Sequence, residues 1–409
     1  MVQVVIIGGG AAGFFCAANI LPAPDVSIRI VEKSSKTLAK VKISGGGRCN
    51  VTHACFEPKE LVKFYPRGAR ELLGPFHTFQ PGDVFDWFHS RGVELKTEDD
   101  NRVFPITDKS QTIIDALESA VAKNNVRVDL NTGITAIKKE DQGYELTTDA
   151  GTTIRADYLV ISAGSSPQFW SLLSKTGFPM IQQVPSLFTF NIKHPIIDGL
   201  AGISVPWAEV SIEKSNFTAQ GPLLITHWGL SGPGILKLSA WAARSLEQVN
   251  YAFKIKVNWL GNEDFEDAIS ALKNMRDLHP KKLTSSQCPF GLVSRLWNSM
   301  LVFSGIEQKN WADVSNKKME ELAQVLTAFT FHVNGKSTFK DEFVTAGGVD
   351  LKSINFKTME SKDFPNVFLA GEVLDIDAVT GGFNFQAAWT TAWIAAKSIS
   401  ERVHSQKSC

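Results

Sequence analysis

A glycine pattern close to the start of the chain has the spacing of a phosphate-binding loop. Gly8, Gly10 and Gly13 stand between a run of apolar residues and a segment of helical composition. Glycine there allows a tight turn and lets backbone N–H groups approach a pyrophosphate. Glu32 follows at the end of the next apolar run, at the spacing of about 20 residues where a carboxylate accepts hydrogen bonds from a ribose diol. The pattern predicts a dinucleotide site. The alternative for the glycines is a purely structural turn, and the alternative for Glu32 is a solvated charge at a strand end.

Features further along the chain favour FAD over NAD as the dinucleotide. The glycine pattern opens the chain, a β-meander is expected between Ile134 and Ile161, and a later apolar run ends in Gly371-Glu372. The glycine-rich residues Gly381 to Asn384 would then begin a helix, whose N-terminal dipole favours negative charge on a reduced flavin. The alternative for this last segment is a capping loop that binds no ligand.

The segment Ser44-Gly45-Gly46-Gly47-Arg48-Cys49-Asn50 is a second glycine-rich loop. Three glycines allow close backbone contact with a ligand, Arg48 can contact a phosphate, and the amide of Asn50 can form hydrogen bonds. The alternative is a flexible surface loop. Together these patterns predict an FAD site near both glycine-rich segments.

Cys49 and Cys55 suggest a rival class, the pyridine nucleotide-disulfide reductases. Five residues separate these cysteines, one more than in that class, so a redox-active disulfide is not expected. The class also needs a second glycine fingerprint, and Gly164-Ser165-Ser166 does not supply one. NAD(P)H would therefore have to reach the flavin directly, as a transient electron donor.

Composition describes an ordinary globular protein. The 42 basic and 42 acidic residues cancel and 44% of residues are hydrophobic, which does not indicate a polyanionic partner but leaves a local basic patch open. The five cysteines are odd in number and lack paired spacing, so we expect a reducing, cytoplasmic location. Three consecutive glycines argue against a membrane span over Val4 to Leu21, and no metal cluster is expected. His227 is expected to be a hydrogen-bonded structural histidine rather than a substrate ligand.

Hydrophobic periodicity predicts an α/β fold with a Rossmann-like, parallel-sheet domain. Its first β-α-β unit has strands at Val4 to Ile7 and Val26 to Val31, and Ser110 is a candidate cap for a later helix. We expect an FAD-binding domain over residues 1–185 and 337–409, a small β-barrel substrate domain over 186–260 and 328–336, and a helical insert over 261–327. The expected strands and helices outside the first unit are Val126 to Leu130, Ile134 to Lys139, Tyr144 to Thr148, Thr152 to Ile161, Leu187 to Ile192, Ala208 to Ile212, Leu223 to Thr226, Tyr251 to Val257 and Asn366 to Ala370 as strands, and Pro81 to Arg91, Ser110 to Asn124, Phe265 to Met275, Leu292 to Phe303, Lys317 to Phe329 and Phe385 to Arg402 as helices.

Over nearly its full length the chain resembles the HI0933-like, or BaiN-like, family of NAD(P)/FAD-dependent oxidoreductases, in part described as aminoacetone oxidases. The resemblance rests on Gly8 to Gly13, Lys40 with Ile43 to Asn50, Arg102 to Pro105, Thr226 to Leu236, Thr345 to Val349 and Ala370 to Gln386. It implies a two-dinucleotide-type FAD domain with a β-barrel and an inserted helical domain. It also implies FAD contacts from Ala12, Glu32, Lys40, Asn50, Ile134, Glu372, Asn384 and Phe385, with Ile134 near the adenine. Ala39 departs from the basic residue that many members have there, which leaves Lys40 alone on that side of the phosphates.

The resemblance leaves the substrate open, because family activities range from oxidation of an amino ketone to reduction of enone-like bonds and of a uracil ring in ribosomal RNA. We expect hydride transfer through FAD to or from a small or planar organic substrate held between the flavin and the barrel domain. The alternatives are an RNA-modifying flavoenzyme, with Lys281-Lys282 and Lys317-Lys318 as candidate RNA contacts, and a non-enzymatic flavin-binding redox sensor. No catalytic residue or oligomeric state is predicted. The predicted cofactor-binding residues are Gly8, Gly10, Ala11, Ala12, Gly13, Glu32, Lys33, Lys40, Arg48, Cys49, Asn50, Ile134, Ala163, Gly164, Gly371, Glu372, Gly382, Asn384 and Phe385.

Overall fold

The computed structural model describes residues 1–337 and 344–405. The chain divides into two compact units, one made of Met1–Val184 with Val344–Cys409 and the other of Pro185–Phe343. No helix in the described part of the chain is both long and apolar enough to cross a membrane.

The first unit is built on a seven-stranded sheet in the order β20-β21-β22-β10-β1-β2-β6. The strands from β22 to β6 are parallel, and β20 and β21 add an antiparallel edge. Strand β1 lies inside the sheet between β10 and β2, and its last four residues are buried, as expected of a parallel strand covered on both faces. This arrangement confirms the predicted Rossmann-like sheet.

The structure gives this unit the strands β1 (Val2–Ile7), β2 (Val26–Val31), β3 (Thr52–His53), β4 (Leu95–Thr97), β5 (Arg102–Pro105), β6 (Arg127–Asp129), β7 (Ile134–Lys139), β8 (Tyr144–Thr148), β9 (Thr153–Ala156), β10 (Tyr158–Ile161), β19 (Thr345–Val349), β20 (Ile354–Asn355), β21 (Glu360–Ser361) and β22 (Val367–Leu369), with β11 (Met180–Pro185) paired to β19 at the boundary. Its helices are α1 (Ala11–Asn19), α2 (Ala39–Gly47), α3 (Pro58–Leu61), α4 (Ala69–Thr78), α5 (Pro81–His89), α6 (Ser110–Lys123), α7 (Pro167–Thr176) and α12 (Phe383–Ser405), with short 3₁₀ turns η1 (Val62–Phe64), η4 (Leu351–Ser353) and η5 (Gly371–Val373).

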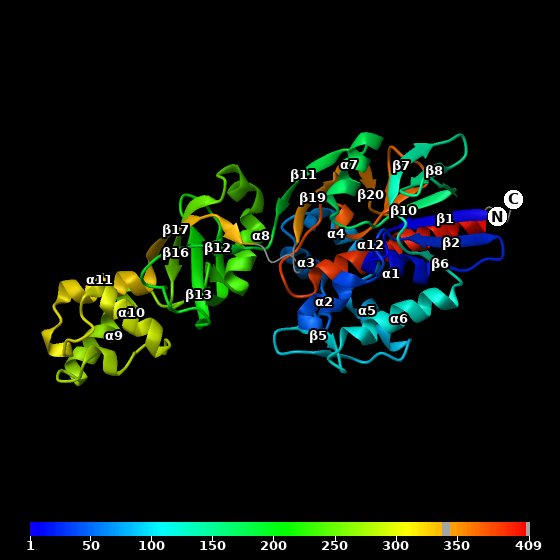
Figure 1. The fold of residues 1–409 in the computed structure, drawn as a ribbon. Helices are drawn as coiled ribbons and strands as arrows, with labels where there is room; N and C mark the ends of the chain where they lie inside the picture. Colours follow the sequence, from blue (N-terminus) through cyan, green and yellow to red (C-terminus); the bar gives the residue numbers. More distant parts are fainter. Residues whose placement is uncertain (338–343, 406–409) are drawn as a thin grey trace. The chain divides into compact units, whose positions relative to one another are not determined.

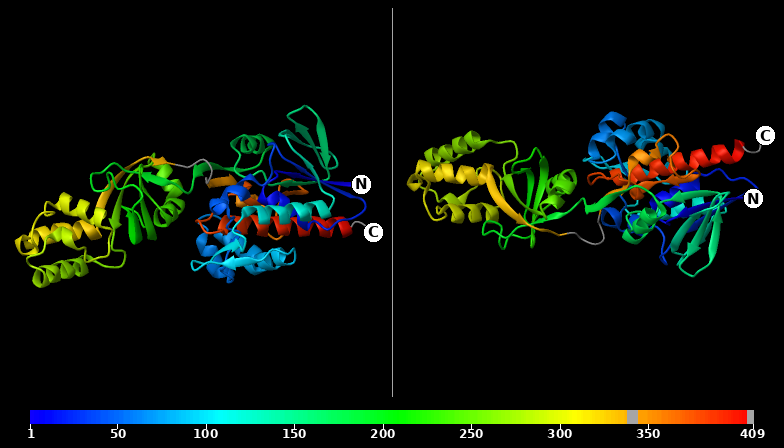
Figure 2. Two further views of the ribbon diagram at one scale, coloured as in Figure 1. Left: turned by 60° about the horizontal axis from the view of Figure 1, so that its bottom comes forward. Right: turned by 90° about the horizontal axis from the view of Figure 1, so that it is seen from above.

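Helices α1 and α12 pack side by side against the sheet (Figure 1). Small residues allow this close approach, because α12 buries Ala387, Ala388 and Ala392 and α1 buries Ala12 and Gly13. Figure 2 shows α6 and α12 on one side of the parallel strands and the β7-β8-β9 meander on the other. The glycine loop before α1 and the N-terminus of α12 therefore belong to one packed layer.

Two local expectations for this unit were wrong. The strand predicted over Thr152–Ile161 is divided at Asp157 into β9 and β10. The Asp157 carboxylate accepts the Gln3 N–H at 2.7 Å, and its own N–H donates to the Gln3 carbonyl at 2.9 Å, so the chain leaves the meander there and enters the sheet beside β1. Ser110 is not the cap of α6, because its hydroxyl donates to the Lys42 carbonyl at 2.8 Å and Lys109 occupies the cap position.

The second unit contains a seven-stranded sheet in the order β17-β16-β13-β14-β15-β12-β18, whose pairings are antiparallel. Buried residues of this sheet, of α8 and of the three helices of the predicted insert form one hydrophobic core, in which Trp259, Trp297 and Phe331 are buried. The insert's separation as a domain of its own stays a prediction. The elements are β12 (Thr189–Asn191), β13 (Ser204–Ile212), β14 (Thr218–Thr226), β15 (Gly229–Ser231), β16 (Ala252–Asn258), β17 (Phe329–Asn334), β18 (Lys336–Ser337), α8 (Pro233–Gln248), α9 (Phe265–Leu278), α10 (Ser294–Ser304), α11 (Asn316–Thr327), η2 (Thr284–Ser286) and η3 (Trp311–Asp313).

Candidate functional site

The three fingerprint glycines have three different roles at the end of β1. Gly8 has a φ of 110°, and a Cβ there would lie 2.5 Å from the Ser162 carbonyl oxygen. A Cβ on Gly13 would overlap the Gly8 carbonyl oxygen, so this glycine sets the distance between α1 and β1. At Gly10 a Cβ would meet no protein atom within 4 Å. Gly10 therefore faces open space at the start of α1, where the positive end of the helix dipole favours a phosphate.

Glu32 lies directly after β2 and is held in place by the glycine loop. Its Oε2 accepts the Gly9 N–H at 2.7 Å, and its Oε1 accepts the Ser34 N–H and hydroxyl, each at 2.8 Å. The carboxylate is half-buried and keeps acceptor capacity for a ribose diol. Lys33, the next residue, donates to the Ser166 hydroxyl at 3.0 Å.

The ends of β10 and β22 bring two further predicted segments to the same loop. Gly164 has a φ of 60°, and a Cβ there would lie 3.6 Å from Oε2 of Glu372. Gly371 has a φ of 74°, and its Cβ would lie 2.9 Å from the Cβ of Ala12 in the first turn of α1. Ala163 precedes Gly164 at the carboxyl edge of the parallel strands, where open α/β sheets bind their ligands. The fold thus brings together the loop after β1, the loop after β10 and the turn after β22.

Lys40 forms an ion pair with Glu372 at this edge. The distance from its Nζ to Oε2 of Glu372 is 2.6 Å, and the Ser165 hydroxyl lies 3.4 Å from the same nitrogen. The lysine side chain is 56% exposed and the glutamate side chain 25% exposed. The cation expected to contact FAD therefore has a carboxylate partner of its own.

The second glycine-rich loop is joined to the start of α12 by four consecutive residues, Asn50 to His53, which we call the clamp segment. In the amide orientation that satisfies its hydrogen bonds, the Asn50 side-chain oxygen accepts the Gly382 N–H at 3.0 Å. The Val51 carbonyl accepts the Trp389 indole N–H at 2.9 Å, and the Thr52 hydroxyl donates to the Gln386 amide oxygen at 2.5 Å. The fourth contact of the clamp segment is made by His53, whose Nδ1 lies 3.0 Å from the Gly381 carbonyl oxygen.

Within this loop the backbone of Gly46 and Gly47 remains accessible. Both have left-handed φ angles, and a Cβ on either would meet no protein atom within 4 Å. A ligand can therefore approach the backbone closely there. The clamp segment, which follows this open backbone, is bonded to the N-terminus of α12. A flavin contact there stays a prediction.

Arg48 and Cys49 have local partners. The Arg48 guanidinium lies 2.6 Å from a Glu98 carboxylate oxygen and 3.9 Å from the centre of the Phe104 ring. Cys49 is fully buried with a φ of 62°, and burial raises the pKa of its thiol to about 12. Its thiol is therefore neutral near pH 7 and unsuited to nucleophilic chemistry. A phosphate contact from Arg48 stays a prediction.

The remaining predicted contacts lie on α12 and the meander. Asn384 uses its amide to bind both backbone groups of Ala378, at 3.0 and 3.2 Å, and so fixes the loop before the helix. Phe385 stacks on Trp389 with ring centres 5.5 Å apart. Ile134 is half-buried at the start of β7. Their contacts with FAD stay predictions.

The structure adds residues that the sequence analysis did not select. The Tyr65 hydroxyl donates to the Phe383 carbonyl at 2.6 Å. Arg67 and Asp377 form a two-pronged ion pair whose side chains are 9% and 0% exposed. The ring of Phe383 stacks on that of Phe64 and contacts the tilted ring of His53, each at a centre distance of 4.3 Å. These contacts join residues more than 300 positions apart, so no local sequence pattern could have indicated them.

His53 gives a pH-dependent contribution to stability. Burial lowers its pKa below the ordinary value, although its contact with the Gly381 carbonyl acts in the opposite direction. Because the unfolded chain then binds a proton more readily, this contribution is complete above the ordinary pKa of about 6.5 and is lost as the pH falls below it. The variant His53→Asn keeps an N–H donor but cannot titrate. We expect its Tm to fall less than the Tm of the parent when the pH is lowered from about 7.5 to about 5.5. Thermal unfolding across that range tests this, and parallel Tm curves for the two proteins would contradict it.

The cysteines and His227 are the remaining side chains with reactive groups. Cys16, Cys49, Cys55 and Cys288 carry free thiols, and Cys409 lies outside the described residues. His227 is exposed on the hairpin between β14 and β15 and has no hydrogen-bond partner for its ring among the described residues, so the expectation of a hydrogen-bonded structural histidine was wrong. Residues 1–337 and 344–405 contain no group of His, Cys, Asp and Glu side chains placed to hold a metal ion.

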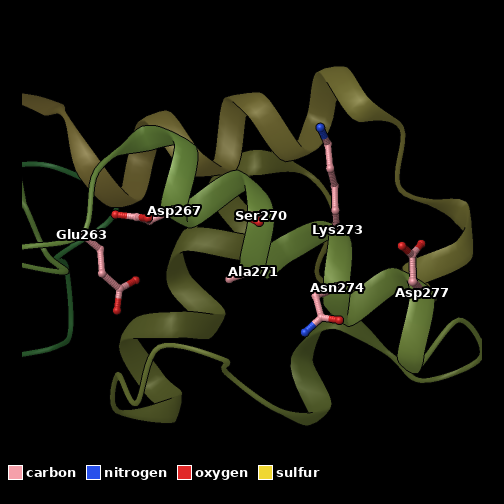
Figure 3. A pocket seen from close by; sticks show the side chains of 7 residues that line it. All are labelled: Glu263, Asp267, Ser270, Ala271, Lys273, Asn274 and Asp277. Carbon is pink, nitrogen blue, oxygen red and sulfur yellow. The ribbon is translucent and has the colours of Figure 1, made fainter.

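A surface hollow on α9 provides a contrast to the glycine loops. Its lining includes the carboxylates of Glu263, Asp267 and Asp277 together with Lys273 (Figure 3). An acidic lining of this kind repels a negatively charged dinucleotide. The glycine loops of the first unit, by contrast, offer open backbone and a helix N-terminus.

The fold and these loops define a dinucleotide-binding α/β enzyme of the class that holds FAD. The HI0933-like protein Rossmann domain model matches residues 2–398. A ribosomal RNA dihydrouridine synthase of Escherichia coli is 28% identical over 407 residues, covering 97% of each chain. A 3-dehydro-bile acid delta(4,6)-reductase of Clostridium scindens is 25% identical, covering 98% of this chain and 100% of the relative. The chain belongs to the HI0933-like family, and it is an FAD-dependent oxidoreductase.

A solved structure shares the fold at lower sequence identity. The 3-ketosteroid-Δ4-(5α)-dehydrogenase of Rhodococcus jostii RHA1 superimposes with a TM-score of 0.51 and 12% identity, covering 98% of this chain and 97% of the other. This similarity supports the predicted fold class.

Proposed function

We propose that this enzyme reduces a carbon–carbon double bond conjugated to a carbonyl group in a planar ring, with NAD(P)H as the electron donor. The observation that carries the proposal is the chemistry shared by two relatives that align along almost the whole chain. One is named for making dihydrouridine and the other for reducing the 4,6 double bonds of a 3-dehydro-bile acid. In both cases a hydride and a proton add across a double bond that a carbonyl group activates.

The residues of the first unit suit this proposal. FAD, when bound, supplies a two-electron carrier between donor and substrate. Gly10 and the first turn of α1 would hold its pyrophosphate, and Glu32 its ribose. The clamp segment fixes the start of α12, where helix geometry leaves N–H groups without intrahelical partners. Those groups would favour negative charge that develops beside them during reduction.

A second candidate is reduction of uridine within ribosomal RNA, because two relatives at 28% and 27% identity carry that name. The predicted RNA contacts on the helical insert receive little support from charge, since residues 261–327 contain 8 basic and 9 acidic residues. Residues 185–260 and 328–337 are more basic, with 7 basic and 4 acidic residues. RNA binding by this enzyme would therefore involve the sheet of the second unit more than the insert.

An anaerobic mixing experiment tests the proposal and separates the two substrates. The flavin is first reduced with NADPH or NADH and is then mixed with a 3-oxo-4-ene steroid, with a uridine-containing ribosomal RNA fragment, or with oxygen. We expect the enone to reoxidise the flavin and to gain one hydride and one proton, as seen by mass spectrometry. The matched control is the corresponding saturated ketone, which offers no double bond and should leave the flavin reduced.

Two results would count against small-ring reduction. Reoxidation by the RNA fragment but not by the enone would favour the RNA-modifying alternative. Reduction of the oxidised flavin by an amine, with release of hydrogen peroxide and no reaction with either acceptor, would favour an oxidase instead.

A further inference from the structure

The cationic side chains predicted near the glycine loop differ in the groups that they contact. FAD brings two negative charges on its pyrophosphate, and the protein adds the carboxylates of Glu32 and Glu372. Three cations were predicted for this region from the sequence. Arg48 lies against Glu98, Lys33 against the neutral Ser166 hydroxyl, and Lys40 against Glu372. Of these three cations, Lys40 is therefore the one that forms an ion pair with a carboxylate of the expected cofactor site.

The position of Glu372 explains why it needs such a partner. Gly371 packs against Ala12 in the first turn of α1, so the backbone of the following residue is held beside the N-terminus of this helix, where we expect the pyrophosphate to bind. The Glu372 carboxylate is only 3.6 Å from the place of a Cβ on Gly164, which brings it to the loop after β10. An uncompensated carboxylate there would repel a pyrophosphate bound at the start of α1, because neighbouring like charges disfavour each other even at high effective dielectric.

We propose that Lys40 is a positioning residue that acts on FAD through Glu372, by neutralising this carboxylate beside the pyrophosphate rather than by contacting the phosphates. The phosphates are then met by backbone N–H groups and the dipole of α1. Ala39, the neighbour of Lys40, adds no second cation beside Glu372. The inference does not depend on which substrate the enzyme reduces.

A double-mutant cycle on FAD affinity tests this inference. FAD is titrated into flavin-stripped parent, Lys40→Met, Glu372→Gln and the double variant, and binding is followed by quenching of flavin fluorescence. We expect Lys40→Met to raise the Kd for FAD about tenfold, which corresponds to a coupling between contacting residues of ordinary size. In the Glu372→Gln background the same substitution should change the Kd less than about twofold, because no carboxylate remains to be neutralised.

The cycle has a matched control in Lys33→Met. Lys33 borders the same loops but donates to a neutral hydroxyl, so its effect on the Kd should be equal in the parent and in the Glu372→Gln background. Lys40→Met is not expected to unfold the protein, because the side chain is 56% exposed; equal Tm values of the flavin-free proteins check this. If Lys40→Met weakens binding equally in both backgrounds, or more strongly in Glu372→Gln, Lys40 contacts the pyrophosphate directly and the inference is overturned.

Discussion

Replacing Gly10 by alanine is expected to weaken FAD binding strongly while leaving the fold intact. The backbone at Gly10 has φ −90° and ψ −167°, an extended conformation that alanine adopts without strain, and the added Cβ would meet no protein atom within 4 Å. The methyl group would instead project into the space where the pyrophosphate must approach the first N–H groups of α1. We expect the Kd for FAD to rise by about 100-fold or more, because a loss of a few kcal/mol of phosphate binding corresponds to that factor. Flavin content after purification and FAD titration measure it.

Two further glycine substitutions separate this effect from a general loss of stability. Gly13→Ala places a Cβ against the Gly8 carbonyl oxygen, so it should lower the Tm of the flavin-free protein as well as flavin binding. Gly74→Ala, in the exposed middle of α4, should leave FAD binding unchanged, because this glycine lies outside the glycine loops. A flavin-free Gly10→Ala protein with a lowered Tm, or one that binds FAD like the parent, would contradict the role assigned to Gly10.

The glycine loop was predictable from the sequence because its determinants are local. The order of strand, glycines, helix, strand and acid lies within the first 32 residues, and each step reflects backbone sterics or helix geometry that neighbouring residues set. The turn after β22 was predictable for the same reason, because Gly371 and Glu372 directly follow a buried apolar strand. Their meeting at α1 follows from the rule that parallel strands present their carboxyl ends at one edge.

The partners of the site residues were not predictable in this way. The bond between Thr52 and Gln386 joins positions 334 apart, and the pair formed by Lys40 and Glu372 joins positions 332 apart. Such contacts depend on the packed arrangement of several elements, and a single sequence shows charges and amides without showing which of them meet. The sequence therefore predicted the geometry of the glycine loop, while the charge pairs around it required the structure.

Breaking the ion pair of Arg67 and Asp377 is expected to have the largest effect on stability among the changes considered for this enzyme. Asp377 is fully buried and Arg67 is 9% exposed, so removing one partner breaks an ion pair that is shielded from water. Such losses cost about 3–5 kcal/mol. We expect Asp377→Asn and Arg67→Met each to lower the midpoint of urea unfolding markedly. Lys63→Met provides the control, because Lys63 and Glu60 form a pair with exposed side chains that contributes less than about 1 kcal/mol.

The same pair should also influence the cofactor, because Asp377 belongs to the loop that leads into α12. Its neighbour Ala378 is bound at both backbone groups by Asn384, so movement of this loop is transmitted to the first turn of the helix. We therefore expect the FAD-bound Arg67→Met protein to show an altered visible circular dichroism spectrum of the flavin. The spectrum of the FAD-bound Lys63→Met protein should match that of the parent. A double variant, Arg67→Met with Asp377→Leu, should regain part of the lost stability, because apolar residues can replace a buried ion pair when both charges are removed together. If it is as unstable as the single variants, the charges are not what stabilises this loop. An unchanged flavin spectrum in Arg67→Met would separate the ion pair's structural role from the cofactor site.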